Sequence, residues 1–215
     1  MSKLPLTLYP HQQECVDFTT SKLLSDGWAG IIHDPGLGKT ATVLRTFAKL
    51  KKKQNDARVI ISCPVCTLKE VWEEHAKIWL DNVSILVVEK LKTLDKEDPN
   101  DYDVIIISRN LIAAAFKRCW KWIENSEQYE DKRGGMRWRG SFRPTGLSSP
   151  LFAPCSRKTL LVIDESHYLR NSGRSKVCLN AHNRLAEHAQ YGLISTATPV
   201  CNKPEDVAGQ LFAIG

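Results

Sequence analysis

The sequence contains no apolar run of the roughly 18 residues that a membrane-spanning helix requires. Its first residues, Met1 to Pro5, are not followed by the long apolar core of a secretory signal peptide. The 7 cysteines are odd in number and show no disulfide-scaffold spacing, which favours a reducing compartment. These absences predict a soluble intracellular protein with no membrane partner, without distinguishing cytoplasm from nucleus.

Apolar, β-branched runs recur along the chain and alternate with segments of helical periodicity. Because the runs are continuous, they are typical of strands in a parallel sheet covered on both faces. Strands are expected at 29–33, 58–62, 83–88, 104–108, 159–163 and 191–196, and helices at 40–52, 68–80, 111–123, 176–188 and 204–212. This alternation predicts an α/β fold with a doubly wound parallel sheet that binds ligands at the carboxyl ends of its strands. With 215 residues, 42% of them hydrophobic, and no internal repeat, residues 1–215 are expected to form one domain.

A basic insertion at about 125–158 interrupts this rhythm, with several glycines and prolines and no convincing period. Residues 117–158 hold ten Lys or Arg against four Asp or Glu, a balance of +6, which leaves the rest of the chain close to neutral. Arg137, Trp138 and Arg139 alternate cations with an aromatic ring, a pattern that suits phosphate contact combined with base stacking. A solvated insertion without a binding role is an equally open interpretation.

The most informative segment is the run His-Asp-Pro-Gly-Leu-Gly-Lys-Thr at 33–40, here called the phosphate loop. Gly36 and Gly38 let the backbone turn so that its N–H groups face phosphate oxygens at the positive end of the next helix. Lys39 would reach the β- and γ-phosphates, and Thr40 would bind Mg²⁺. The residues expected to bind ATP in this loop are Asp34, Pro35, Gly36, Leu37, Gly38, Lys39 and Thr40.

A second segment, at 161–167, ends a predicted strand in Asp164 and Glu165. Asp164 is placed to bind Mg²⁺ directly or through water, and Glu165 to orient and deprotonate the attacking water. The phosphate loop followed by this acidic pair, each at a strand end, predicts a nucleotide triphosphatase site that uses ATP and Mg²⁺.

Further stretches decide the kind of triphosphatase. Gln12 precedes the first strand and could read the adenine edge, and the other polar strand ends carry Pro64, Thr67, Ser108, Ser195, Thr196 and Thr198. Together with the D-E-S-H spelling at 164–167, these stretches resemble the motifs of superfamily 2 helicases, and within them the Swi/Snf-like ATPases. The resemblance covers nearly the whole chain. Ser195 and Ala197 depart from the branch's usual Leu-Thr-Gly-Thr-Pro.

The resemblance implies a RecA-like P-loop NTPase lobe of an ATP-dependent helicase or translocase, which couples ATP hydrolysis to DNA translocation or remodelling. It implies catalytic roles for Lys39, Asp164, Glu165 and His167, and a coupling role for Ser195, Thr196 and Thr198 between the phosphate site and the nucleic acid. The nucleic acid would be DNA, with duplex favoured, or RNA, and it would contact Pro64, Thr67, Ser108 and the insertion. Thr67 would also cap the following helix.

The family's second RecA-like lobe, which carries arginines that complete the ATP site, does not follow within the sequence to Gly215. We therefore expect slow hydrolysis until a second lobe, in the same or another chain, supplies those arginines. The alternatives are an RNA helicase or restriction-type motor lobe, or a non-catalytic module that holds ATP or DNA.

Overall fold

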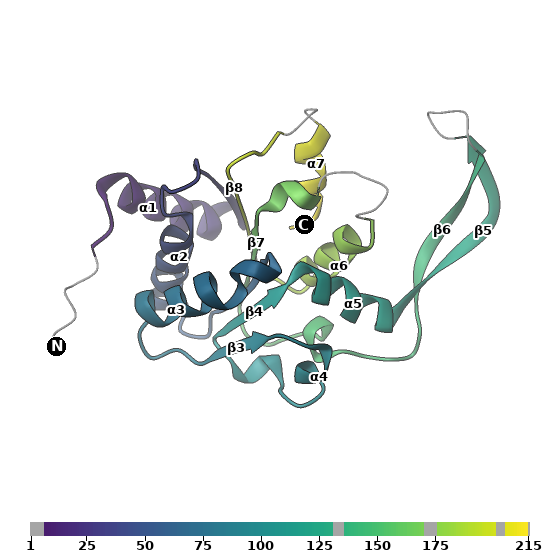
Figure 1. Cartoon of the computed structure of the whole chain (residues 1–215), viewed down its shortest axis with the longest axis horizontal. Helices are drawn as coiled ribbons and strands as arrows, with labels where there is room; N and C mark the ends of the chain where they lie inside the picture. The colour runs from purple at the N-terminus through teal and green to yellow at the C-terminus, as the bar shows by residue number, and fades with distance from the viewer. Residues whose placement is uncertain (1–6, 131–135, 170–175, 201–204, 215) are drawn as a thin grey trace.

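The computed structural model describes residues 7–130, 136–169, 176–200 and 205–214, with side chains at all of these except 124–130, 136–139, 176 and 205–206. Its centre is a six-stranded parallel sheet in the order β1-β8-β7-β2-β4-β3 (Figure 1). The strands are β1 (Trp28–Ile32), β2 (Arg58–Cys63), β3 (Ile85–Val88), β4 (Val104–Ser108), β7 (Thr159–Asp164) and β8 (Tyr191–Thr196). Each lies within about two residues of its expected range, so the predicted doubly wound parallel sheet is confirmed.

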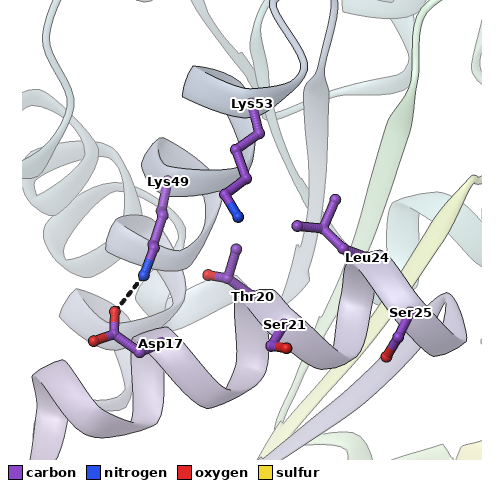
Figure 2. Close-up of a pocket in the computed structure, with 7 residues that line it drawn as sticks. All are labelled: Asp17, Thr20, Ser21, Leu24, Ser25, Lys49 and Lys53. Carbon is purple, nitrogen blue, oxygen red and sulfur yellow. Dashed lines mark hydrogen bonds and ion pairs between the residues drawn. The ribbon is translucent and has the colours of Figure 1, made fainter.

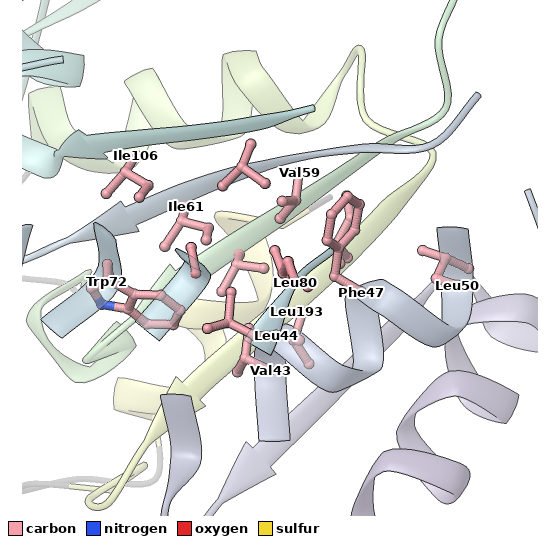
Figure 3. Close-up of a cluster of buried hydrophobic side chains, with 14 of the residues drawn as sticks. Val43, Leu44, Phe47, Leu50, Val59, Ile61, Trp72, Leu80, Ile106 and Leu193 are labelled. Carbon is pink, nitrogen blue, oxygen red and sulfur yellow. The ribbon is translucent and has the colours of Figure 1, made fainter. Parts of the chain in front are cut away.

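Helices cover both faces of this sheet. The helices α1 (Pro10–Asp26), α2 (Lys39–Lys53) and α3 (Glu74–Trp79) lie on one face, and α5 (Arg109–Cys119), α6 (Lys176–Ala186) and α7 (Glu205–Phe212) lie on the other, with the short α4 (Leu91–Leu94) beside β3. Ile61 of β2 packs with Phe47 and Trp72 on the first face (Figure 3), while its neighbour Ile60 packs with Phe116 on the second. Each such buried side chain contributes about 1.5–3 kcal/mol, which explains why the central strands carry apolar side chains toward both faces.

Three helical segments differ from the expected helices. The sequence pattern did not predict α1, which is held to the sheet by buried Val16 and Leu23 and ends at Gly27, a glycine with φ of 82°. The helix expected over 111–123 is wrong at its end, because α5 stops at Cys119 and Trp120 already belongs to the next strand. The helix expected over 68–80 is present, but it starts with a π-helical turn at Leu68–Glu73 before α3. In the described parts of the chain, no helix combines the length and apolar character needed to cross a membrane.

The segment expected to be an irregular insertion contains an antiparallel hairpin, β5 (Trp120–Glu130) and β6 (Met136–Pro144), which projects away from the sheet (Figure 1). Rings anchor its base, since Trp120 and Phe142 each lie 4.9 Å from Phe116 of α5, centroid to centroid. A Cβ at Gly140 would lie 2.6 Å from the ring of Trp122. Glycine at position 140 therefore lets the Trp122 ring lie directly over the partner strand. Because β5 and β6 pair as a hairpin, the expectation of an irregular loop is wrong for these residues.

Candidate functional site

The phosphate loop joins β1 to α2 at the carboxyl edge of the sheet. Gly36 and Gly38 have φ of 83° and 77°, values that residues with a side chain rarely adopt. A Cβ at Gly38 would also lie 2.3 Å from Gln12 Nε2, so two requirements fix glycine there. Lys39 opens α2, and its Nζ donates to the backbone oxygen of His33 at 3.0 Å. The ammonium thus lies over the loop, where a phosphate oxygen can replace a main-chain carbonyl as its acceptor.

Gln12 ties the start of α1 to the phosphate loop. Its Oε1 accepts from the backbone N–H of Tyr9 at 3.0 Å, and its Nε2 donates to the backbone oxygen of Leu37 at 3.1 Å. The side chain is buried. The adenine-reading role of Gln12 remains a prediction. Its observed contacts give it a second role, because they hold Leu37 of the phosphate loop against the start of α1.

Asp164 ends β7 and lies beside β8, where Ser195 is its register partner. Burial raises the pKa of Asp164 to about 6, and the adjacent carboxylate of Glu165 also raises it, while an N–H donated by Trp72 Nε1 to Asp164 Oδ2 at 3.1 Å opposes the rise. Ser195 Oγ is buried and has no hydrogen-bond partner among the described residues. A half-buried carboxylate beside an unpaired hydroxyl, with half-buried Thr40 at the start of α2, is a donor set that fits a hard cation such as Mg²⁺.

Glu165 and His167 form the next layer of the site. Glu165 has φ of 50°, an uncommon value for a residue with a side chain. His167 Nδ1 lies 3.2 Å from Glu165 Oε2 and 3.0 Å from Thr196 Oγ1 at the end of β8. The same hydroxyl oxygen accepts the backbone N–H of Thr198 at 3.1 Å. The structure therefore brings the expected catalytic and coupling residues together across neighbouring strands.

Three of the expected nucleic-acid residues, Pro64, Thr67 and Ser108, lie at or just after the carboxyl ends of β2 and β4. A surface groove of about 570 Å³ lies there, lined by Ser108 and Lys69 among others. Ser108 Oγ accepts the backbone N–H of Leu111 at 3.3 Å and so caps α5. Thr67 Oγ1 donates back to the Pro64 carbonyl at 3.0 Å and makes no cap bond to the helix that follows, so its expected capping role is wrong. The preceding turn offers this hydroxyl a nearer acceptor.

Two residues of this edge, Trp72 and Tyr168, were not expected from the sequence, whereas Arg109 lies in the 108–110 segment that was a candidate for nucleic-acid contact. Trp72 lies in the π-helical turn after β2 and reaches Asp164 at the end of β7. Arg109 lies over the ring of Tyr168, with its guanidinium carbon 4.0 Å from the ring centroid. The backbone of Arg137, Trp138 and Arg139 lies in β6, and their side chains fall outside the described part of the structure.

A second cavity, of about 470 Å³, lies between α1 and α2 (Figure 2). Lys49 and Lys53 of α2 line it opposite Asp17 and Ser21 of α1, and Lys49 pairs with Asp17. Lys49 lies ten residues after Lys39, or about 15 Å along the helix axis. This cavity is therefore separate from the phosphate loop.

The sheet order places the phosphate loop, Thr196, Asp164, Pro64 and Ser108 at successive strand ends along one edge. A parallel sheet with a glycine-rich loop, a lysine and an acidic pair at that edge defines a RecA-like P-loop nucleotide triphosphatase lobe.

The SNF2-related domain family matches residues 11–214, and the chain belongs to this family as a Swi/Snf-like ATPase lobe. A curated relative, Protein CHROMATIN REMODELING 24 of Arabidopsis thaliana, is 23% identical over 211 residues, which are 95% of this chain and 17% of the relative. The Sulfolobus solfataricus SWI2/SNF2 ATPase core in complex with dsDNA has a TM-score of 0.69 at 20% identity, over 98% of this chain and 36% of that one. The structure of the Sulfolobus solfataricus SWI2/SNF2 ATPase core domain has a TM-score of 0.64, also at 20% identity, over 99% and 36%. The chain thus spans about a third or less of the length of these relatives.

Proposed function

We propose that this chain is the ATP-binding and hydrolysing lobe of a DNA-dependent motor that couples ATP turnover to movement along duplex DNA. The observation that carries the proposal is the meeting, in an SNF2-family chain, of the phosphate loop, Asp164 with Glu165, and His167 with Thr196 at one edge of the sheet. Duplex DNA is favoured as the partner because a solved relative of the same fold was obtained with dsDNA.

Each residue has a distinct task in this proposal. The loop N–H groups and Lys39 hold the phosphates, and Thr40 and Asp164 hold Mg²⁺, which supplies positive charge to the phosphate oxygens when bound. Glu165 orients the attacking water and accepts its proton. His167 and Thr196 connect this carboxylate to β8. Lys39 is suited to its task because its described contacts are main-chain oxygens of His33 and Asp34 rather than a carboxylate.

Residues 1–215 are proposed to act as one ATP-binding domain, with a second RecA-like lobe in the same or another chain. In P-loop motors an arginine supplied from outside the phosphate site contributes roughly 10³–10⁵ in rate. The chain alone should therefore bind ATP and Mg²⁺ but turn over slowly. A turnover of several per second by the chain alone, lost in Glu165→Gln, would refute the need for a second lobe.

ATP binding is tested by calorimetry with Lys39→Ala. A charge-assisted hydrogen bond contributes about 1.5–3 kcal/mol, so the affinity should fall by roughly 10- to 100-fold. Lys49→Ala is the matched control, because it removes a lysine of the same helix that is paired with Asp17. Equal affinities for wild type and Lys39→Ala would overturn the assignment of the phosphate site.

DNA binding by the basic hairpin is tested by fluorescence anisotropy on duplex and single-stranded DNA and on duplex RNA, from low to physiological salt. Replacing Arg133, Arg137, Arg139 and Arg143 with Ala should weaken binding and reduce its salt dependence, because each phosphate contact releases counterions. ATP affinity should not change. An unchanged salt slope would leave the hairpin without a role in binding, and tighter binding to RNA would favour an RNA motor.

ATP and DNA binding with no turnover, even with the second lobe added, would favour a non-catalytic module.

A further inference from the structure

Arg109 occupies a position that the stability of its own helix does not explain. It is the first residue of α5, directly after the carboxyl end of β4. A cation at a helix N-terminus is opposed by the helix dipole. Among the described residues, no carboxylate forms an ion pair with Arg109, and its recorded contact is the face of the Tyr168 ring, 4.0 Å from guanidinium carbon to ring centroid. A half-buried cation at this edge, whose contact among the described residues is a ring face, is available to a phosphate group.

Tyr168 connects this cation to the hydrolytic site. Tyr168 as a residue is 55% exposed, so packing in the core does not account for its position. The ring lies 4.3 Å from the ring of His167, centroid to centroid, at an interplanar angle of 34°. Its backbone N–H donates to the carbonyl of Glu165 at 3.1 Å, and this bond fixes the backbone position from which the Tyr168 ring extends. Tyr168 therefore lies against Arg109 and His167 at once.

His167 has two alternative partners for the same nitrogen. Nδ1 can donate to Glu165 Oε2 at 3.2 Å, or it can accept the hydroxyl proton of Thr196 at 3.0 Å. The two bonds require different positions of the hydrogen. In the first arrangement the carboxylate of Glu165 is engaged as an acceptor, and in the second it is released to accept a proton from water.

We propose that Arg109 and Tyr168 are positioning residues through which a bound DNA phosphate acts on His167 and thereby on Glu165, an inference that rests on the proposed DNA-dependent ATPase function. A guanidinium bonds a phosphate with two parallel N–H···O bonds, which are stronger than its contact with an exposed ring. A phosphate at the end of β4 therefore draws Arg109 from Tyr168. The released ring shifts against the imidazole, the imidazole proton passes from Nδ1 to Nε2 through water, and Nδ1 exchanges Glu165 for the Thr196 hydroxyl.

The test uses the full chain and a short DNA duplex, and it reads the ring-nitrogen NMR shifts of His167, assigned with His167→Gln. Saturating duplex should move these shifts in the wild type and in Tyr168→Phe, which keeps the ring. The movement should be lost in Tyr168→Leu and in Arg109→Gln. Arg118→Gln is the matched control on α5, because Arg118 pairs with Asp95 at the opposite end of the helix, and it should behave as the wild type.

Anisotropy on the same samples separates this inference from the function on which it rests. Arg109→Gln should reduce the salt slope of duplex binding by about 0.9, the contribution of one phosphate contact, whereas Tyr168→Leu should leave the slope unchanged. Duplex that binds to the wild type without moving the His167 shifts, or that moves them equally in Tyr168→Leu, overturns the inference alone. A chain that binds no duplex at low salt overturns the DNA-dependent function and the inference together.

Discussion

Replacing Asp164 with asparagine should stabilise the unliganded protein while removing its Mg²⁺-dependent ATP binding. The pKa of Asp164 is raised by burial to about 6 from an ordinary value of 3.8. This difference of roughly two pH units, at about 1.36 kcal/mol for each, means that the ionised carboxylate costs the fold about 3 kcal/mol at pH 7. Asparagine keeps an oxygen that can accept the N–H of Trp72 Nε1, so the charge is the main thing removed.

The sign of the pH dependence follows from the same pKa. Between about pH 6 and pH 4 the folded protein holds a proton on Asp164 that the unfolded chain has released, so lowering the pH through this window stabilises the wild type. Asp164→Asn lacks this gain. Its advantage should therefore be about 3 kcal/mol at pH 7 and should shrink towards zero near pH 4.

Urea unfolding at pH 7, 6, 5 and 4 measures the difference in free energy of unfolding between the wild type and Asp164→Asn. Because both proteins carry the same other titrating groups, most of their contributions cancel in this difference. Asp81→Asn is the matched control, because Asp81 is exposed in the turn before β3 and its replacement should change the free energy of unfolding by less than about 0.5 kcal/mol. Calorimetry with ATP, with and without Mg²⁺, should show that Asp164→Asn loses the Mg²⁺-dependent gain in affinity. A variant less stable than the wild type at pH 7, or a difference that does not vary with pH, would refute the reasoning.

The remaining predictions concern stability away from Asp164. Gly38→Ala should lower the free energy of unfolding by about 1–3 kcal/mol and by more than Gly36→Ala, because a Cβ at Gly38 meets Gln12 whereas nothing lies within 4 Å of one at Gly36; equal urea midpoints for the two variants would contradict this. Although burial opposes it, hydrogen bonds from Lys51 and Arg157 lower the pKa of Asp103 to about 2, so this carboxylate contributes stability above about pH 4 that is lost as the pH falls towards 2. Asp103→Asn should therefore cost about 2 kcal/mol at pH 7 and less at pH 3, and urea unfolding that gives the same cost at both pH values would argue against the ion-pair explanation.

The parallel sheet and the phosphate loop could be predicted because their signals are local. Continuous runs such as Val104–Ser108 mark buried strands, and a glycine-rich loop carries its chemistry within eight adjacent positions. Helix α1 could not be seen in this way, since it buries Gln12, Thr19 and Thr20 alongside its apolar residues and so lacks a clear apolar stripe.

The contacts that could not be predicted depend on the order of strands in space. Trp72 meets Asp164, and Arg109 meets Tyr168, because β2, β4 and β7 are neighbours in the sheet. No periodicity in the sequence encodes these pairs. The hairpin was missed for a related reason, since the pairing of Trp122 with Phe142, which brings the Trp122 ring over Gly140, is decided between two strands rather than within either.

The left-handed backbone of Glu165 has an evolutionary consequence. At φ of 50°, glycine or asparagine would be tolerated more easily than glutamate, which costs the fold on the order of 1 kcal/mol. Selection for stability therefore favours glycine or asparagine at this position, and under the role proposed for Glu165 it is opposed by selection for turnover. A lineage that kept this lobe as a passive scaffold should show its loss of hydrolysis first here, as Asn or Gly after the aspartate, while the glycines of the phosphate loop, which the backbone itself requires, persist much longer.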